Sequence, residues 1–420
     1  MDAISGRKSH FRLKNLGWLN LYFLILIVFS FLIRIYLASN LPGFLGDQAY
    51  FINWMETVGK YGLADVYAHG DAVNYPPFFL ALLGIYGKVL AALNLQVVPG
   101  DVLSRLLPIL FDMVAIIIFA IASKKINNPF IRAILVTFLA LNPAILLDGA
   151  IWGQIDMLHG ILMVCSILLL VSNPLLSGSI FAIALLAKFQ SIVIAPVFAI
   201  YFLKIIWEKW EFKQLFKYIL GFCIPLIIIG TYFAVHGTLY AMLEHGYLSA
   251  VGTFPTVTLN AMNIWYYIIG TTPDVSDSVI ILPHLSLKRV GVLILAVAVL
   301  LAWMYVFFNR KNSTAVLLKA ATFICFAFYM LPTQMHERYS FPTIVFVIFV
   351  LLYDVKWTGI ALGLTFAISL NLMYVLYSRE NNMAMFIATL NCFVFYSMGK
   401  ALLKEYSDKI ESLVATYNKE

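Results

Sequence analysis

The chain has 420 residues, of which 62% are hydrophobic and only 12% are charged. Soluble domains carry about 25% charged residues, so a soluble protein of this length could not cover its surface with so few. The composition excludes a large soluble domain and predicts that lipid surrounds most of the chain. The net charge of +7 does not indicate nucleic-acid binding, because the basic residues lie mainly in short loops that set membrane orientation.

A first membrane helix is predicted near the N-terminus. Four basic residues, the last being Lys14, precede an apolar run over 16–37. This run is longer than a signal-peptide core and lacks a small-residue cleavage site. It therefore predicts a helix with its basic end in the cytoplasm, and Arg34 near the far end is expected to snorkel to the outer interface. The four cysteines lie in apolar runs without metal-ligand spacing, which predicts unpaired packing residues.

Further apolar runs approach the roughly 20 residues that a membrane helix needs. Together with the first run they give twelve predicted spans, at 16–37, 101–123, 131–148, 157–172, 176–188, 190–206, 216–235, 289–308, 314–331, 341–353, 357–377 and 383–401. Lys188 and Gln190 interrupt the stretch 176–206, which is consistent with two short helices that meet at the outer face. The predicted fold is a single all-α polytopic membrane domain over 1–420 with about 12 transmembrane helices.

The run 77–93 either spans the membrane or lies at its interface. A span would place the basic loop 123–125 outside, whereas an interfacial helix places it inside, and the positive-inside bias favours the interface. Both termini are then cytoplasmic in a multi-pass protein of the cell membrane. Four substantial segments lie outside, at 38–100, 149–156, 236–288 and 332–340. The first and third are far longer than ordinary connections, so we expect them to contain interfacial helices and to carry function.

The first of these segments contains an acidic residue soon after the first helix. Asp47 follows that helix by about ten residues, so its carboxylate is expected at the membrane–water boundary, where it could act as a base. The alternative is a helix N-cap, for which Asp is a favoured residue. Further along, Tyr75-Pro76-Pro77 redirects the chain before the next apolar run.

The second segment is dense in polar groups. Two carboxylates, an amide and an imidazole occur here beside a tryptophan, namely Asp148, Trp152, Gln154, Asp156 and His159. Most of them would share one face of a continuous helix, although Gly149 and Gly153 favour a break. Such groups are costly at a membrane boundary unless they have partners, which favours a functional site. The alternative is an interfacial helix cap with a tryptophan anchor.

Cations within apolar runs form another set of candidates. Arg105 and Asp112 are two helical turns apart, so either they pair with each other or Arg105 meets a phosphate group. Lys188, with Gln190 close by, is a lone cation in an apolar stretch. Intramembrane cations indicate function by default, and snorkelling to the surface is the alternative.

The third and fourth outer segments contain further amide and basic side chains. Asn260 and Asn263 stand near Trp265, and they are typical either of a polar ligand site or of turns. His336, Glu337 and Arg338 lie between two prolines. Arginine presents a fork of donors suited to phosphate, and histidine can add another. The alternative is an internal Glu337–Arg338 pair.

Taken together, these motifs resemble the GT-C superfamily of membrane glycosyltransferases, and within it bacterial mannosyltransferase-like proteins related to the second mannosyltransferase of GPI-anchor synthesis. The resemblance extends in order from about 46 to 339 and covers most of the chain. Its stretches are Gly46-Asp47 with Tyr75-Pro76-Pro77, Asn142-Pro143 with Trp152-Gly153-Gln154-Ile155-Asp156, Lys188-Phe189-Gln190, Asn260-Ala261-Met262-Asn263-Ile264-Trp265, and Met335-His336-Glu337-Arg338-Tyr339.

The resemblance implies a polyprenyl-phosphate-linked sugar as donor, transfer at the outer leaflet, and Asp47 as the catalytic base. Many family members have an acidic pair at this position, whereas Gln48 follows Asp47 here. A second carboxylate must then come from elsewhere, with Asp156 and Asp148 as candidates. This departure does not decide between transfer with and without a divalent cation.

The chemistry of sugar transfer assigns roles to these groups. A base removes the proton of the acceptor hydroxyl, and cations stabilise the departing phosphate. The predicted phosphate ligands are Arg338, His336, Lys188 and Arg105. The predicted substrate-binding residues are Trp152, Gln154, Asp156, Asp148, His159, Gln190, Asn260, Asn263, Glu337 and Tyr75.

We therefore expect a membrane-embedded inverting hexosyltransferase for mannose, glucose or galactose, acting on a glycan or glycolipid acceptor. An apolar groove between short helices would hold the prenyl chain. The main alternative is a transporter or flippase for a lipid-linked or amphipathic solute, which should have polar residues and broken helices near the midplane. A third is a non-catalytic subunit of a polysaccharide assembly complex.

Overall fold

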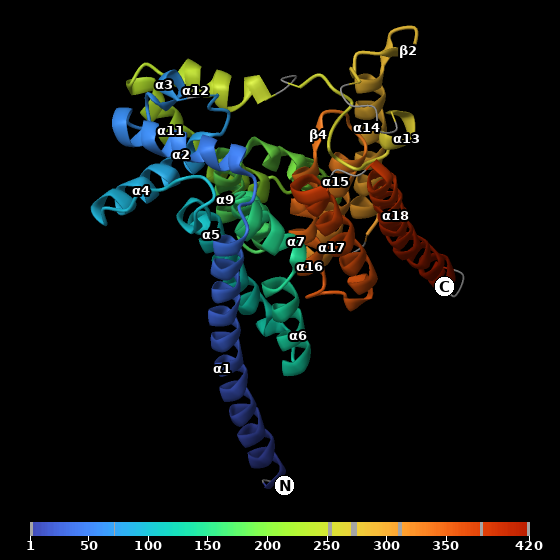
Figure 1. Ribbon diagram of the computed structural model, residues 1–420. Helices are drawn as coiled ribbons and strands as arrows, with labels where there is room; N and C mark the ends of the chain where they lie inside the picture. Colours follow the sequence, from blue (N-terminus) through green and yellow to red (C-terminus); the bar gives the residue numbers. More distant parts are fainter. Residues whose placement is uncertain are drawn as a thin grey trace.

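The computed structural model describes residues 3–70, 72–250, 254–269, 275–309, 313–378 and 381–417. The structure is 79% helical and has almost no sheet (Figure 1). Among these residues, eight helical segments are long and apolar enough to cross a membrane, namely Gly17–Asn40, Val102–Lys125, Pro129–Trp152, Phe189–Lys209, Lys213–Val235, Leu287–Phe307, Val355–Tyr377 and Met383–Ser407. These helices confirm the prediction of an all-α membrane protein.

The eight long segments contain nine of the α-helices and five short turns of other helix types. Their elements are α1 Ala3–Asn40, α5 Val102–Ala122, η1 Ser123–Lys125, α6 Pro129–Ala140, α7 Pro143–Ile145, η2 Leu146–Trp152, η3 Phe189–Ile194, α10 Ala195–Lys209, α11 Lys213–Val235, α14 Leu287–Phe307, η6 Val355–Trp357, α17 Thr358–Met373, η7 Tyr374–Ser378 and α18 Asn381–Tyr417. The other four predicted spans correspond to shorter helices, namely α8 Asp156–Leu170, α9 Pro174–Ala187, α15 Thr314–Met330 and α16 Phe341–Val350.

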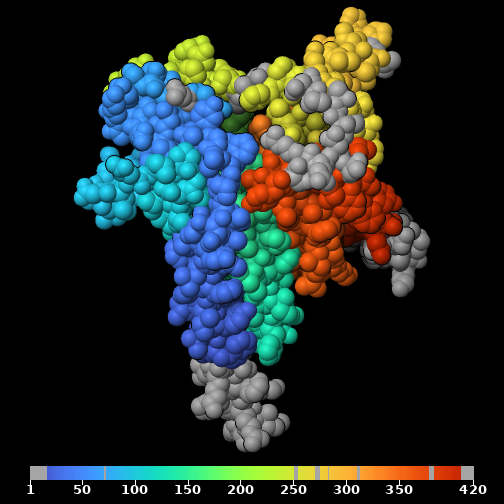
Figure 2. Space-filling view, viewed as in Figure 1, coloured from blue at the N-terminus to red at the C-terminus, as the bar shows by residue number. Residues whose placement is uncertain are grey.

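The two long connecting segments also form short helices. Segment 38–100 contains α2 Leu45–Tyr61, α3 Val66–His69 and α4 Pro77–Ala92, and segment 236–288 contains α12 Leu239–Gly246, η4 Leu248–Ala250 and α13 Tyr266–Ile269. The coloured residues of both segments, blue to cyan for the first and yellow-green to gold for the second, lie in the upper part of the molecule, above most of α1 (Figure 2). The helix α4, which covers most of the run 77–93, crosses the direction of α1 instead of lying alongside it (Figure 1).

The few strands connect distant loops. β1 Thr258–Leu259 pairs in parallel with β4 Met335–His336, which joins segment 236–288 to segment 332–340. A short antiparallel hairpin forms from β2 Ile280–Leu282 and β3 Leu285–Ser286. The β1–β4 pairing fixes the residues before η5 Glu337–Ser340, and so it positions the polar turn that contains Arg338.

The predicted interruption within 176–206 is confirmed. The helix α9 ends at Ala187, and Lys188 has an extended backbone with φ −155° and ψ 125° before the η3 turn begins. The helices α9 and α11 pack so closely that a Cβ atom at Gly221 would lie 1.9 Å from the carbonyl oxygen of Leu175. Small residues allow this kind of close backbone approach between membrane helices.

Arg34 does not snorkel to the interface, so that prediction is wrong. Its Nε atom donates to Asp112 Oδ2 at 2.9 Å, and both side chains are fully buried. Its Nη1 atom also donates to the carbonyl oxygens of Ser30 and Ala140. Of the two alternatives for Arg105, the pair with Asp112 is excluded, because Asp112 pairs with Arg34 of α1. A partner within reach removes the need to place the charge in water.

Candidate functional site

Asp47 is the centre of a polar cluster at the beginning of α2. Its Oδ2 atom accepts hydrogen bonds from Trp152 Nε1 at 2.7 Å and from Gln154 Nε2 at 2.6 Å, and it also pairs with Arg338 Nη1. No described residue donates a hydrogen bond to Oδ1, and the side chain is 19% exposed. The N-cap of α2 is Phe44, without a side-chain cap, so Asp47 does not cap this helix.

One glycine explains how two neighbouring side chains reach the same carboxylate oxygen. Gly153 lies between Trp152 and Gln154 and has φ +91°, a left-handed conformation that favours glycine. The backbone N–H groups of Gly153 and Gln154 both donate to the Asp148 carbonyl, at 3.1 and 3.0 Å. This turn ends η2 and directs the indole and the amide toward Asp47.

Replacing Gly153 by Ala is expected to destabilise the protein by about 1–3 kcal/mol, because a left-handed non-glycine residue is strained. The added Cβ atom would also lie 2.9 Å from Arg105 Cγ. The measurement is the thermal midpoint of the purified protein in detergent. Gly59→Ala on α2 is the matched control, since a Cβ there meets nothing within 4 Å. Equal midpoints for the two variants would contradict the prediction.

Gln48, which follows Asp47, has a structural role that the sequence did not reveal. Its Nε2 atom donates to the carbonyl oxygens of Pro42 and Trp152, at 3.2 and 3.0 Å. Its Oε1 atom accepts from Gly100 N at 2.7 Å and Ser104 Oγ at 2.9 Å. A carboxylate could not make both donations. The amide therefore joins three segments of the chain around Asp47.

A second ion pair lies deeper in the protein. Asp156, the first residue of α8, pairs through Oδ1 with Lys188 Nζ, and the two side chains are 0% and 9% exposed. His159 Nε2 lies 3.5 Å from the same oxygen, and His159 Nδ1 lies 3.3 Å from Ser191 Oγ. The predicted residues Asp156, His159 and Lys188 are thus brought together.

Two tyrosines lie between the ion pairs. The Lys188 Nζ atom is 5.7 Å from the ring centre of Tyr75 and 5.8 Å from that of Tyr339. Tyr75 also donates to Gln154 Oε1 at 3.4 Å, and Gln190 donates to the Tyr339 carbonyl at 3.1 Å. Tyr339 was not among the predicted site residues, although it adjoins Arg338. These contacts join the two ion pairs into one cluster.

Four other predicted residues do not make the contacts that were expected of them at a substrate site. Arg105 donates to the backbone carbonyls of Ala38, Leu41, Gly100 and Ile151, so it holds the loops beneath the cluster. The Asn263 side chain donates a hydrogen bond to the Tyr329 carbonyl and accepts one from the Trp265 N–H group. Asn260 is exposed, and its backbone forms an isolated antiparallel β-bridge with the backbone of His336. Asp148 is fully buried, and neither of its carboxyl oxygens has a hydrogen-bond partner among the described residues.

His336 and Glu337 precede Arg338 in an enclosed turn. The ring of His336 packs against Phe254 and Tyr339, with ring centres 5.8 and 5.2 Å apart. Burial and, to a smaller extent, the charge of Arg338 lower the pKa of His336 to about 3. The imidazole is therefore neutral, and it can donate to an anion without adding a charge. Burial raises the pKa of Glu337 to about 7, although Arg338 opposes this shift.

The raised pKa of Glu337 predicts a pH-dependent stability. The folded protein keeps this proton up to about pH 7, whereas an ordinary glutamate loses it near 4.5. The folded state binds more protons between these values, so this residue's contribution to the free energy of unfolding falls as pH rises through that window. Thermal midpoints measured between pH 4.5 and 8 should therefore fall more steeply with rising pH for the wild type than for Glu337→Gln, which cannot titrate. Parallel plots of midpoint against pH for the two proteins would contradict the prediction.

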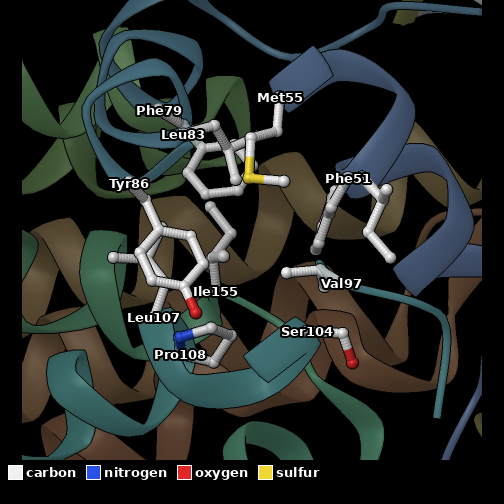
Figure 3. A pocket seen from close by; sticks show the side chains of 11 residues that line it. Phe51, Met55, Phe79, Leu83, Tyr86, Val97, Ser104, Leu107, Pro108 and Ile155 are labelled. Atoms are coloured by element: carbon white, nitrogen blue, oxygen red, sulfur yellow. The ribbon is translucent and has the colours of Figure 1, made fainter. Parts of the chain in front are cut away.

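A partly open apolar cavity adjoins the cluster, and its space of about 310 Å³ includes open solvent (Figure 3). It lies between α2, α4 and α5 and is lined by Phe51, Ile52, Met55, Phe79, Leu83, Tyr86, Val97, Ser104, Leu107, Pro108 and Ile155. Phe51 is one helical turn after Asp47, and Ile155 lies between Gln154 and Asp156. The cavity and the polar cluster therefore share these two short stretches of chain.

No protein-family model and no curated protein matches this chain. Within the described parts of the chain, no three His, Cys, Asp or Glu side chains are grouped so that they could hold a metal ion. The functional assignment therefore depends on the geometry of the cluster and on the chemistry of its side chains.

Proposed function

We propose that the chain is an inverting glycosyltransferase that moves one hexose from a polyprenyl-phosphate carrier to a glycan or lipid-linked acceptor. The observation that carries this proposal is a carboxylate with one open oxygen beside a guanidinium with unused donors. Asp47 keeps Oδ1 free of described donors, and Arg338 uses only Nη1 in its described hydrogen bonds, while its buried Nε atom has no partner. The two side chains are 19% and 14% exposed.

These two groups suit the two ends of a sugar-transfer reaction. Asp47 accepts the proton of the acceptor hydroxyl while the oxygen of that hydroxyl bonds to C1 of the sugar. The bond from C1 to the phosphate oxygen breaks, and the electron pair leaves with prenyl phosphate. A guanidinium binds phosphate oxygens through a planar fork of donors. Arg338 stabilises the leaving group in this way, so the phosphate needs no proton.

The deeper cluster and the cavity suit the rest of the donor. Lys188, held by Asp156 between two tyrosine rings, adds positive charge near Arg338, and Gln154 and Gln190 provide amides for sugar hydroxyls. The apolar cavity beside Phe51 and Ile155 accepts the first part of the prenyl chain. Burial of such a chain in apolar surroundings is favourable by about 0.8 kcal/mol per methylene.

The proposal includes a membrane arrangement. Twelve helices cross the bilayer in a GT-C-like fold, both termini are cytoplasmic, and the Asp47 cluster faces the outer leaflet. The short helices α8, α9, α15 and α16 are the additional spans. The transverse direction of α4 supports its place at the interface, beside the site.

A lipid-linked solute transporter is the second candidate. One observation favours it, because the Arg34–Asp112 ion pair lies between two long apolar helices. Such charges mark transport pathways in many membrane proteins. Both side chains are fully buried, however, and Arg34 is bound by Ser30 and the Ala140 carbonyl. These contacts fit a link between α1, α5 and α6 better than a pathway.

The deciding experiment uses the purified full chain in proteoliposomes with prenyl-phosphate mannose, glucose or galactose and a panel of glycan and glycolipid acceptors. Mass spectrometry measures free prenyl phosphate and glycosylated acceptor. Formation of both products with one of the sugars supports the proposal. Movement of the intact lipid-linked sugar between leaflets, without cleavage, would establish the transporter instead.

A further inference from the structure

The Asp47–Arg338 contact raises a difficulty for the proposed reaction, on which this inference rests. The base and the phosphate-binding cation neutralise each other in the structure, although both are needed by the substrates. The contact also differs from the other ion pairs within the described residues of this region. Arg34–Asp112 is fully buried, and Lys188–Asp156 nearly so, whereas Asp47 and Arg338 are each partly exposed.

The geometry shows which contact is easiest to break. Three donors converge on Asp47 Oδ2, although a carboxylate oxygen has only about two lone-pair directions. Trp152 and Gln154 are fixed by the left-handed turn at Gly153, and both are almost fully buried. Arg338 reaches Asp47 from the partly exposed side. It is therefore the donor that can leave while the other two continue to orient the carboxylate.

Arg338 also has a surface on which it can move. Its guanidinium carbon lies 5.6 Å from the ring centre of Trp152, so the cation is held over the face of the indole. A shift across this face changes its hydrogen bonds without sending it into lipid. An arriving phosphate offers bidentate hydrogen bonds, which are stronger than a single contact to a crowded oxygen.

We propose that the Asp47–Arg338 ion pair is a resting-state latch, which the phosphate of the donor opens by taking Arg338 and thereby freeing Asp47 as the base. The site then becomes more basic when a donor is present. Donor binding precedes productive acceptor binding, because Asp47 is a weaker base toward an acceptor or water while Arg338 pairs with it.

Two chemical labels applied to the wild-type protein in detergent test the latch. Carbodiimide-driven coupling of glycinamide reports access to Asp47, and phenylglyoxal reports access to Arg338, with both sites read by peptide mass spectrometry. The probe is farnesyl phosphate, which carries the anion without a sugar, and farnesol is the neutral control. We expect farnesyl phosphate to increase coupling at Asp47 severalfold and to decrease modification of Arg338, and farnesol to do neither.

Control positions and a variant make the result specific. The exposed residues Glu56 and Arg289 should keep the same labelling throughout. In Arg338→Gln, coupling at Asp47 should be high without any probe and should not respond to farnesyl phosphate. If farnesyl phosphate protects Asp47 and Arg338 together, the anion covers an intact pair, and the latch is overturned while the phosphate site stands. If neither residue responds, the donor site of the proposed function fails and the latch fails with it.

Discussion

Replacing Asp47 by Asn is expected to lower the rate of hexose transfer by about 10²–10⁴-fold, which is the usual contribution of a positioned general base. Asparagine keeps the size of the side chain and one acceptor oxygen for Trp152 and Gln154, but its amide cannot take up a proton. The donor should therefore still bind, and the loss should fall on kcat. The measurement is steady-state transfer with the prenyl-phosphate sugar identified in the screen.

The matched control is Glu56→Gln, which removes an exposed carboxylate from the same helix. It should retain wild-type transfer. Equal thermal midpoints for Asp47→Asn and wild type would show that the fold is intact. Full turnover by Asp47→Asn would remove this residue from the role of base.

The second large effect is expected for Arg338→Ala. Hydrogen bonds to a charged group contribute about 1.5–3 kcal/mol, so the KM for the donor should rise roughly 10- to 150-fold. The KM for the acceptor should stay close to that of wild type. The donor KM of Arg338→Lys should lie between those of the wild type and Arg338→Ala, because lysine restores the charge but lacks the planar fork of donors.

Arg289→Ala provides the control for charge. Arg289 is exposed near the start of α14 and donates to the His284 carbonyl, so its loss should leave both KM values unchanged. An Arg338→Ala variant with unchanged donor KM and raised acceptor KM would place Arg338 on the acceptor side and refute its role in phosphate binding.

Part of this arrangement could be predicted from the sequence because it is local. The apolar runs gave the long helices, and the polar Lys188 indicated the break that the structure contains. Clusters of polar residues between apolar runs also identified Asp47, the 152–159 region and Arg338. They meet in the fold because uncompensated polar groups are costly near a membrane and are stabilised by one another.

The remaining contacts depend on how distant helices pack. Arg34 and Asp112 are 78 positions apart on different helices, so nothing in either run indicates their pairing. Arg105 resembles a phosphate ligand in sequence, yet the loops near Leu41 and Gly100 wrap around it and use its donors. The role of Gln48 could not be predicted, because an amide carries no chemical signal until its four hydrogen-bond partners are known.

The Arg34–Asp112 pair has a consequence for biosynthesis. A charged side chain in an isolated membrane helix has a cost of insertion, which is about 2.5–3.5 kcal/mol at the helix centre and smaller toward the helix end, where Arg34 lies. Arg34 is synthesised 78 residues before the carboxylate that neutralises it in the finished protein. The first helix therefore enters the membrane incompletely compensated and gains its partner only when α5 arrives. Assembly of these two helices is coupled, and a fragment that ends before Asp112 lacks the contact that settles α1 in lipid.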